Sequence, residues 1–306
     1  MEWDVIIIGG GPAGLTAGLY AARARLKTLL LEKLVPGGQA STTAEIENYP
    51  GAGKGITGPE LTQRMEEQAR EFGMEIINKE VNEIKLSGRK RIVKCGSEEF
   101  VAKAVIIATG AEPRKLGVPG EDGFRGRGVS YCATCDGAFF TGKRVMVVGG
   151  GDTAIEEALF LTRFAEKVIV VHRRDQLRAT RVLQDRAFKN KKIEVIWDSV
   201  VKEIKGKELV EEVILENVKT GETVNVPADG VFVAIGYSPS TGFLKGLVEL
   251  DGNGYVITDD NMQTNIPGVF AAGDLRQKPL RQVVTAVSDG AVAAVSASRY
   301  IEDMEK

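Results

Sequence analysis

The chain carries the same strand–glycine–helix segment twice, and this repeat constrains its fold more than any other feature. Residues 4–14 read DVIIIGGGPAG and residues 144–154 read RVMVVGGGDTA. In each copy a β-branched run predicts a buried strand, the glycines predict a turn, and the alanine-rich stretch that follows predicts a helix. The same offset of 140 residues separates the two glycine turns and also separates Glu32 from His172, which end the next apolar runs. The pattern predicts two βαβ units.

Both glycine turns match the fingerprint of dinucleotide-binding folds, glycine-x-glycine-x-x-glycine or -alanine, between a strand and a helix. The first glycine permits the tight turn, the second lets the backbone approach a pyrophosphate, and the small third residue lets the helix pack closely. The N–H groups that begin the helix then face the phosphates. A plain glycine turn is the alternative, but each turn here has its strand, its helix and its following strand. We expect two dinucleotide sites, at Gly9, Gly11, Pro12, Ala13 and Gly14 and at Gly149, Gly151, Asp152, Thr153 and Ala154.

The residues that end the second strands distinguish the two ligands. Glu32 can accept hydrogen bonds from the hydroxyls of an unphosphorylated ribose. The second copy instead has His172, Arg173 and Arg174 there, with Arg178 one turn further on. Guanidinium groups pair with a 2′-phosphate that a carboxylate would repel. The first site is therefore predicted to bind FAD or NAD and the second NADPH; a solvated basic surface is the alternative for the arginines.

Two further apolar runs, 105–111 and 231–236, each lead into a glycine turn, at Gly110 and Gly236, and resemble the last buried strands of the two copies. Proline follows each run within three residues, at 113 and 239, which suits a domain exit. Another strand within 264–274 and an alanine- and valine-rich helix complete the first copy. The predicted fold class is α/β with two Rossmann-like nucleotide-binding domains. One is split between residues 1–113 and 242–306, and the other is inserted as residues 114–241.

Three cysteines are too few for a disulfide scaffold, but Cys132 and Cys135 form a C-x-x-C pair. A zinc site needs four ligands, and only Cys95 and His172 remain to complete one, so we expect no metal site. The short spacing lets one sulfur attack and the other resolve, which favours a redox pair. Asp136 follows directly and could protonate the departing thiolate; a turn or cap role before the next glycine is the alternative.

The composition excludes several other functions. Forty basic and forty-two acidic residues leave a net charge of −2, which disfavours generic binding to nucleic acid. No apolar run approaches the roughly 20 residues that span a bilayer. The acidic first residues lead directly into a strand, so we expect no signal peptide and a cytoplasmic protein.

On these motifs the sequence resembles the low-molecular-weight thioredoxin reductases, bacterial or archaeal in type, along essentially its whole length. The segments that carry the resemblance are 9–14, 37–39, 105–110, 132–136, 149–154, 172–174 with Arg178, 269–274 and 281–283. The resemblance implies FAD in the split domain, NADPH in the inserted domain, and a homodimer. Its partner would be thioredoxin or a thioredoxin-like or glutaredoxin-like protein.

The resemblance also assigns roles to single positions. Gln39 and Asn48 would lie along the FAD, and Asp274 would hold its ribityl chain. Gln282 and Val283 would approach the flavin ring. The further cofactor-binding positions that it implies are Gly38, Val81, Thr109, Gly110, Ile235, Gly236, Gly273 and Arg281.

In the cycle implied by the resemblance, NADPH reduces the flavin, the flavin reduces the Cys132–Cys135 disulfide, and the dithiol reduces the partner. Cys135 would face the flavin, Cys132 would attack the partner and Asp136 would act as the general acid; the sequence alone does not order the two sulfurs. The inserted domain would rotate, with hinges that we expect at 113–116 and 240–243. The Phe139–Phe140 pair could form an apolar docking patch with Arg127 at its rim, or could equally be core aromatics.

Three alternatives stay open. The chain could use another electron donor, such as ferredoxin or NADH, although the arginines after the second strand oppose this. It could reduce another acceptor, as peroxiredoxin-type reductases do, although those carry an extra N-terminal redox domain. It could also be a flavin-binding redox sensor without turnover, although a sensor needs only one nucleotide site.

Overall fold

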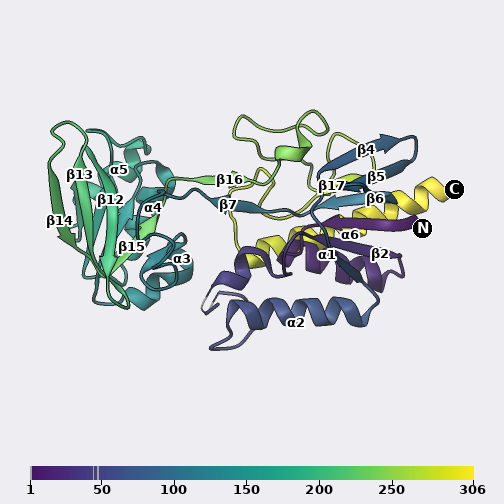
Figure 1. Cartoon of the computed structure of the whole chain (residues 1–306), viewed down its shortest axis with the longest axis horizontal. Coiled ribbons are helices and arrows are strands. Elements are labelled where there is room, and N and C mark those ends of the chain that lie inside the picture. Colours follow the sequence, from purple (N-terminus) through teal and green to yellow (C-terminus); the bar gives the residue numbers. More distant parts are fainter. Residues whose placement is uncertain (1, 44, 47) are drawn as a thin grey trace. The chain divides into compact units, whose positions relative to one another are not determined.

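The computed structural model describes residues 2–43, 45–46 and 48–306. The chain forms two compact units, one made of Met1–Glu112 with Ser238–Lys306 and the other of Pro113–Tyr237 (Figure 1). Two short strands lie where the chain crosses from one unit to the other, β7 (Ala111–Pro113) and β16 (Tyr237–Pro239), and they pair with each other. We refer to the two units as the split unit and the inserted unit.

The split unit is built on a mostly parallel sheet in the order β3-β2-β1-β6-β5-β4, with β17 also paired to β6. Only β4 and β5 run antiparallel to their neighbours. The strands of this sheet are β1 (Glu2–Ile8), β2 (Thr28–Glu32), β3 (Glu75–Asn78), β4 (Glu83–Ser87), β5 (Lys90–Cys95), β6 (Glu98–Ile107) and β17 (Val269–Ala271). The helical elements are α1 (Pro12–Arg23), η1 (Gly38–Thr42), α2 (Gly58–Glu71), η3 (Gly242–Leu244) and α6 (Val283–Glu305).

The sheet of the split unit is buried on both faces, which explains the unbroken apolar runs of its strands. Successive side chains of β1 point to opposite faces. Val5 and Ile7 pack into a cluster with residues of α1 and α6, whereas Ile6 and Ile8 pack into a second cluster with residues of the 244–275 segment. Both helices of the first cluster start beside the carboxyl ends of the strands, where ligands bind in open α/β sheets.

The inserted unit repeats this plan. Its sheet has the order β11-β10-β9-β15-β8, and all its strand pairs are parallel. The strands are β8 (Val129–Ser130), β9 (Arg144–Val148), β10 (Lys167–Val171), β11 (Ile193–Ile196) and β15 (Gly230–Val233). The helical elements are α3 (Ala133–Asp136), η2 (Gly137–Phe140), α4 (Asp152–Leu161) and α5 (Arg181–Lys189). An antiparallel layer of β12 (Ser199–Gly206), β13 (Val210–Asn217) and β14 (Thr223–Pro227) is added to it.

The duplication read from the sequence is therefore a duplication of structure. The first strand of each copy lies between the strand that follows its helix and the strand that leads toward a chain crossing: β1 between β2 and β6, and β9 between β10 and β15. The register is also alike, because Ile8 pairs with Ile107 in one unit and Val148 pairs with Val233 in the other. The predicted α/β fold with two Rossmann-like domains is confirmed.

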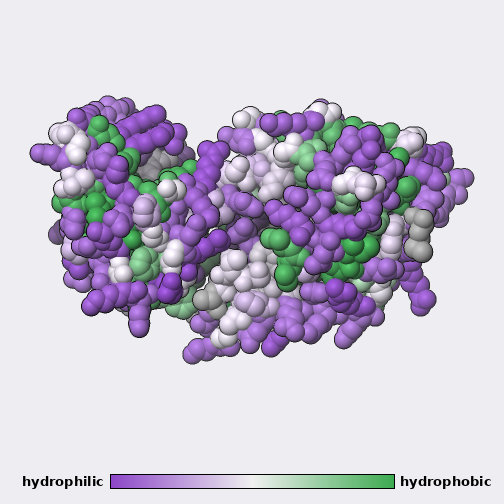
Figure 2. All heavy atoms as spheres, in the orientation of Figure 1, coloured by the Kyte–Doolittle hydropathy of each residue, from purple (hydrophilic) through white to green (hydrophobic). Residues whose placement is uncertain are grey.

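Hydrophilic residues cover most of the face shown in the space-filling view, and hydrophobic residues form separate patches on it (Figure 2). Among the described residues, no helix combines the length and the apolar character that crossing a membrane requires.

Candidate active site

The two cysteines of the C-x-x-C pair form a disulfide at the start of α3, with their Cα atoms 5.3 Å apart. Cys132 is the N-cap residue of this helix, and its sulfur accepts a hydrogen bond from the backbone N–H of Cys135 at 3.2 Å. The same sulfur lies 3.3 Å from the hydroxyl oxygen of Thr134. An N–H group aimed at a sulfur favours its thiolate form. The local fold thus prepares Cys132 to carry negative charge once the disulfide is reduced.

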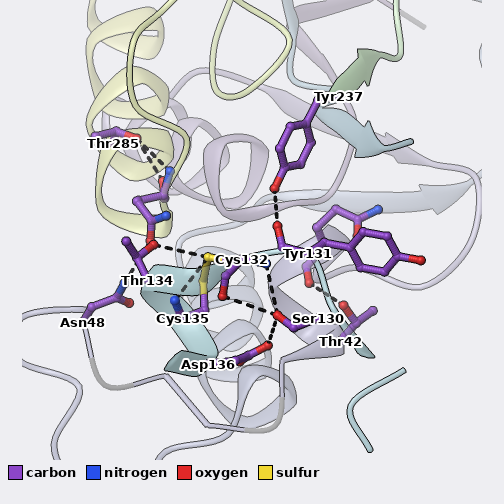
Figure 3. The surroundings of a disulfide bond; sticks show 12 residues. Thr42, Asn48, Ser130, Tyr131, Cys132, Thr134, Cys135, Asp136, Tyr237 and Thr285 are labelled. Atoms are coloured by element: carbon purple, nitrogen blue, oxygen red, sulfur yellow. Dashed lines mark hydrogen bonds between the residues drawn. A yellow bond between two sulfur atoms is a disulfide. The ribbon is translucent and has the colours of Figure 1, made fainter. Parts of the chain in front are cut away.

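A carboxyl group lies behind the disulfide on the same helix. Asp136 Oδ2 accepts a hydrogen bond from the hydroxyl of Ser130 at 2.6 Å, and Ser130 Oγ accepts the backbone N–H of Cys132 at 3.1 Å (Figure 3). Burial raises the pKa of Asp136, and the hydrogen bond from Ser130 opposes the shift only in part. A carboxyl group with a raised pKa keeps its proton closer to neutral pH, so Asp136 is suited to protonate a thiolate. Ser130 carries no motif signal, and only the tertiary contact reveals it.

The disulfide belongs to the same unit as the second glycine turn. The helix that carries the pair, α3, packs against α4, which starts at Asp152 directly after that turn. Ala133, between the cysteines, is fully buried in the cluster that also contains Ala154 of α4. The redox pair is therefore built into the unit that bears the arginines.

In the split unit, the glycine turn and the end of β2 form one polar cradle. Both carboxylate oxygens of Glu32 accept backbone N–H groups, from Gly10 at 2.7 Å and from Leu34 at 3.0 Å. Gly14 allows close packing, because a Cβ there would collide with the carbonyl oxygen of Gly9. A Cβ on Gly38 would lie 3.0 Å from the Cα of Gly11, so the 37–39 turn faces the first glycine turn. Each carboxylate oxygen keeps a lone pair for a ribose hydroxyl.

Asp274 lies beside this cradle with an unsatisfied oxygen. Its neighbour Gly273 is in close contact with Ala13 of α1, because a Cβ on Gly273 would lie 2.9 Å from that of Ala13. Burial raises the pKa of Asp274 to about 6, against the opposing charges of Lys278 and Arg281. Its Oδ1 atom is buried without a hydrogen-bond partner among the described residues. A buried acceptor of this kind calls for a donor such as a ligand hydroxyl, so the residues fit an FAD with its ribityl chain here.

The structure brings other expected residues of this unit together in pairs. Asn48 donates a hydrogen bond from Nδ2 to Oε1 of Gln282 at 2.9 Å, and Gln282 is the N-cap residue of α6. The hydroxyl of Thr109 donates a hydrogen bond to the carbonyl oxygen of Ser240. The backbone N–H of Ser240 in turn donates to the carbonyl oxygen of Gly110.

Four more expected positions of this unit have other surroundings. Val283 begins α6, Gln39 is exposed in η1, and Val81 packs, partly buried, against the cluster around Ile8. The Arg281 guanidinium lies over the Tyr255 ring, 4.1 Å from its centre, and donates to the carbonyl of Asp274 at 3.2 Å.

In the inserted unit, the second glycine turn is open at the position where a pyrophosphate is expected. A Cβ on Gly151 would meet no atom within 4 Å, so the backbone there is bare. The carbonyl of Gly150 accepts the N–H groups of Arg178 and Ala179 at 2.7 and 3.1 Å, which fixes the arginine segment beside the turn. Asp152 Oδ1 accepts the N–H of Thr180 at 2.6 Å. These contacts fit a nucleotide whose phosphates reach both the turn and the arginines.

The remaining expected residues of this unit differ in exposure. Arg173, Arg174 and Arg178 are exposed, as is Thr153 at the start of α4. His172 is only 5 % exposed and lies beneath the turn, against Gly150. At the end of the unit, Ile235 is 37 % exposed, and the carbonyl of Gly236 accepts the N–H of Arg114.

Comparison with known proteins agrees with this arrangement. Residues 3–290 match the model of the family described as pyridine nucleotide-disulphide oxidoreductase. The chain belongs to this family.

Members named as thioredoxin reductases are similar over nearly the whole chain. One from Peptoclostridium acidaminophilum is 53 % identical, over 98 % of this chain and 97 % of the relative. The crystal structure of thioredoxin reductase from Streptococcus pyogenes MGAS5005 matches with a TM-score of 0.94 at 53 % identity, and covers 99 % of both chains. The Lactococcus lactis thioredoxin reductase, in a structure described as the FR conformation, matches with a TM-score of 0.69 at 51 % identity, over 98 % of this chain and 99 % of its own. As an oxidoreductase of this family, the chain combines two glycine turns with a disulfide beside a buried carboxyl group.

Proposed function

We propose that this protein is a thioredoxin reductase that takes electrons from NADPH through FAD to the Cys132–Cys135 disulfide and on to the disulfide of thioredoxin. The observation that carries the proposal is the disulfide at the start of α3, with Asp136 behind it, in the unit that holds the second glycine turn. Relatives that share about half of its residues over the full length carry the same name. A glutaredoxin-like or other thioredoxin-like protein is a second acceptor to be tested.

FAD is assigned to the split unit. Its pyrophosphate would lie on the first glycine turn, its adenosine ribose on Glu32, and its ribityl chain on the unsatisfied Oδ1 of Asp274. The Asn48–Gln282 pair, Gln39 and Val283 would lie along the cofactor, as the resemblance implies. When bound, FAD supplies the two-electron relay between NADPH and the protein disulfide.

NADPH is assigned to the inserted unit. The bare backbone at Gly151 would take the pyrophosphate, and the exposed Arg173, Arg174 and Arg178 would pair with the 2′-phosphate. His172 supports the turn from beneath, because its ring is buried against Gly150. We therefore assign the contact with the 2′-phosphate to the three arginines and not to His172.

The residues around the disulfide have separate roles in the thiol chemistry. Reduction breaks the S–S bond with two electrons, and Asp136 supplies the proton that leaves one sulfur as a thiol. The backbone N–H of Cys135 stabilises the thiolate of Cys132. This thiolate attacks the partner's disulfide, and Cys135 then resolves the mixed disulfide. Per turnover, NADPH is oxidised to NADP⁺, one further proton is taken from solvent, and the partner gains two thiols.

Rotation of the inserted unit is part of the proposal. The S. pyogenes and L. lactis structures are almost equally similar to this chain in sequence, but their TM-scores to it are 0.94 and 0.69. These two relatives therefore differ from each other in the placement of large parts of the chain. We place the pivots of this chain at the paired strands β7 and β16, next to the 113–116 and 240–243 segments expected from sequence. A crosslink between the two units that leaves turnover unimpaired would refute the rotation.

A homodimer and a cytoplasmic location complete the proposal. Both rest on the resemblance, together with the redox use of the cysteine pair, which suits a reducing compartment. Light scattering of the purified protein and fractionation of cells that express it test them.

The decisive experiment follows flavin absorbance in a stopped-flow instrument after mixing with NADPH or with NADH, and then measures thioredoxin disulfide reduction. We expect fast bleaching with NADPH and steady turnover with thioredoxin. Bleaching without turnover would favour a redox sensor or another acceptor. Failure of both nicotinamides to bleach the flavin would favour another donor, such as ferredoxin.

A further inference from the structure

The backbone that leads into Cys132 is held by the two tyrosines of the inserted unit, and the thiol chemistry uses neither of them. The chain has six tyrosines, and of these only Tyr131 and Tyr237 lie within Pro113–Tyr237. Tyr131 directly precedes Cys132, and Tyr237 begins β16, where the chain leaves the inserted unit. The hydroxyl of Tyr237 donates a hydrogen bond to the carbonyl oxygen of Tyr131 at 2.8 Å (Figure 3).

The peptide group that joins Tyr131 to Cys132 is therefore held at both ends. Its carbonyl oxygen accepts the hydroxyl of Tyr237, and its N–H, which belongs to Cys132, donates to Ser130 Oγ at 3.1 Å. The plane of this peptide group fixes the backbone of the N-cap residue, which lies outside the regular helical conformation. From that position the Cys132 sulfur accepts the backbone N–H of Cys135 at 3.2 Å. The two hydrogen bonds to the peptide group thus help to keep the sulfur on the N–H that stabilises its thiolate.

The side chain of Tyr131 is linked to the other segment that crosses between the units. Its hydroxyl donates to Oε1 of Glu121 at 2.9 Å, and Glu121 is only 1 % exposed. The same carboxyl group accepts the backbone N–H groups of Leu116 and Gly117, just after β7, each at 2.8 Å. Burial and the hydrogen bond to Glu121 raise the pKa of Tyr131, so its hydroxyl keeps its proton and remains a donor. Through Tyr131, the residues just after β7 and at the start of β16 are both linked to the backbone before Cys132.

We propose that Tyr131 and Tyr237 are positioning residues for Cys132, which fix the peptide group before its sulfur and link that peptide group to both segments through which the chain enters and leaves the inserted unit. The inference rests on the redox role proposed for the cysteine pair. In the proposed rotation about β7 and β16, the sulfur would then move as one body with the residues next to the pivots.

Phenylalanine substitutions remove each hydrogen bond and keep the ring. Tyr237→Phe leaves the carbonyl of Tyr131 without the hydroxyl that holds it, so the peptide group is held at its N–H end by Ser130. Tyr131→Phe removes the donor to Glu121 and frees the ring from the segment after β7. Tyr20→Phe, at a position of α1 that is 43 % exposed, removes a hydroxyl from the split unit and is the matched control.

The test is the ionisation of the Cys132 thiol in the reduced holoenzyme. A chemical reductant opens the disulfide, iodoacetamide alkylates the thiols over a range of pH, and tandem mass spectrometry separates the label on Cys132 from that on Cys135. We expect the ionisation constant of Cys132 to fall about threefold to tenfold in Tyr237→Phe, because the thiolate loses part of its contact with the N–H of Cys135. Tyr131→Phe should shift it in the same direction by a smaller factor, and Tyr20→Phe should leave it unchanged.

Urea unfolding of the same variants separates positioning from a merely structural role. Variants that lose stability while their Cys132 profiles coincide with that of the wild type would overturn the proposal, and so would an equal shift in Tyr20→Phe. The measurement involves neither NADPH nor thioredoxin. A protein that shows the expected shifts but fails to reduce thioredoxin would therefore contradict the proposed function and leave this inference standing.

Discussion

The imidazole ring of His172 occupies the space in which Gly150 lacks a side chain. A Cβ on Gly150 would overlap the ring, whose Nε2 atom is buried without a hydrogen-bond partner among the described residues. Burial lowers the pKa of His172, and the charges of Arg178 and Arg174 lower it further. The residue that follows β10 is therefore a neutral support for the second glycine turn near pH 7.

Two alanine substitutions should show that Gly150 matters for the stability of this turn and that Gly151 matters for binding of the ligand. Gly150→Ala forces the His172 ring to move and should lower the free energy of unfolding by about 1–3 kcal/mol. Gly151→Ala places its methyl group in open space and should change stability by less than about 0.5 kcal/mol, yet raise the KM for NADPH, because the methyl group fills the place of the pyrophosphate. Urea unfolding and steady-state kinetics measure both. Equal loss of stability in the two variants would contradict the assignment.

Removal of the Arg178 side chain should weaken the preference for NADPH over NADH. Its backbone is fixed to Gly150, and its guanidinium group is exposed beside the turn. Loss of a charge-assisted contact to the 2′-phosphate costs about 1.5–3 kcal/mol, so Arg178→Ala should raise the KM for NADPH about tenfold to a hundredfold and leave NADH kinetics unchanged. Arg186→Ala, an exposed arginine of α5, is the control. A variant that weakens NADH as much as NADPH would argue against a phosphate contact.

Serine substitutions in the C-x-x-C pair should block reduction of thioredoxin and leave reduction of the flavin by NADPH intact. Cys132→Ser and Cys135→Ser should abolish thioredoxin reduction, because no disulfide can form, while NADPH still bleaches the flavin. Cys95→Ala removes a free, buried cysteine of β5 and should keep full activity. Stopped-flow absorbance and a thioredoxin turnover assay read the two halves separately. If either serine variant still reduced thioredoxin, the Cys132–Cys135 pair would not be the redox centre.

The acid role of Asp136 predicts a defined pH dependence. Its folded-state pKa is raised, so the protonated form stabilises the fold at low pH, and this contribution is lost as the pH rises through the folded pKa. The disulfide-reduction step should slow over the same rise in the wild type. Asp136→Asn should slow it by about 10²–10⁴ at low pH and abolish this pH dependence. Rapid kinetics from pH 5 to 9 would measure it, and an unaltered profile in the variant would assign the proton to another group.

A buried charge cluster around Asp289 of α6 should support the FAD site. Asp289 is 7 % exposed; it accepts the N–H of Gly273 at 3.0 Å and lies 3.0 Å from Arg276 and 2.8 Å from Lys278. Its removal leaves two buried cations without their partner, which costs about 3–5 kcal/mol. Asp289→Asn should lose that stability and release FAD. The control is Asp303→Asn at the exposed end of the same helix. Unfolding curves and flavin retained after gel filtration give the result.

Much of the fold could be read from local patterns. The glycine turns, the β-branched runs before them and the C-x-x-C pair each depend on residues that are neighbours in the chain, so backbone geometry and burial impose them wherever the segment lies. The antiparallel strands β12 to β14 were not expected, because half-polar runs around residues 199–227 lack a comparable signal. The sequence predicts the arginines after β10 as a phosphate contact, which stays a prediction, whereas it gave no sign that His172 is buried against Gly150.

The sequence by itself determined the two βαβ units and the redox pair, because those signals are set by spacing along the chain. The tertiary structure alone decided which polar groups meet: Ser130 with Asp136, and Asn48 with Gln282, which are 234 residues apart. Such contacts depend on how elements pack, and no residue type or spacing encodes them. Burial then raises the pKa of Asp136 and of Asp274, so the proton chemistry at these two carboxyl groups is a property of the packing.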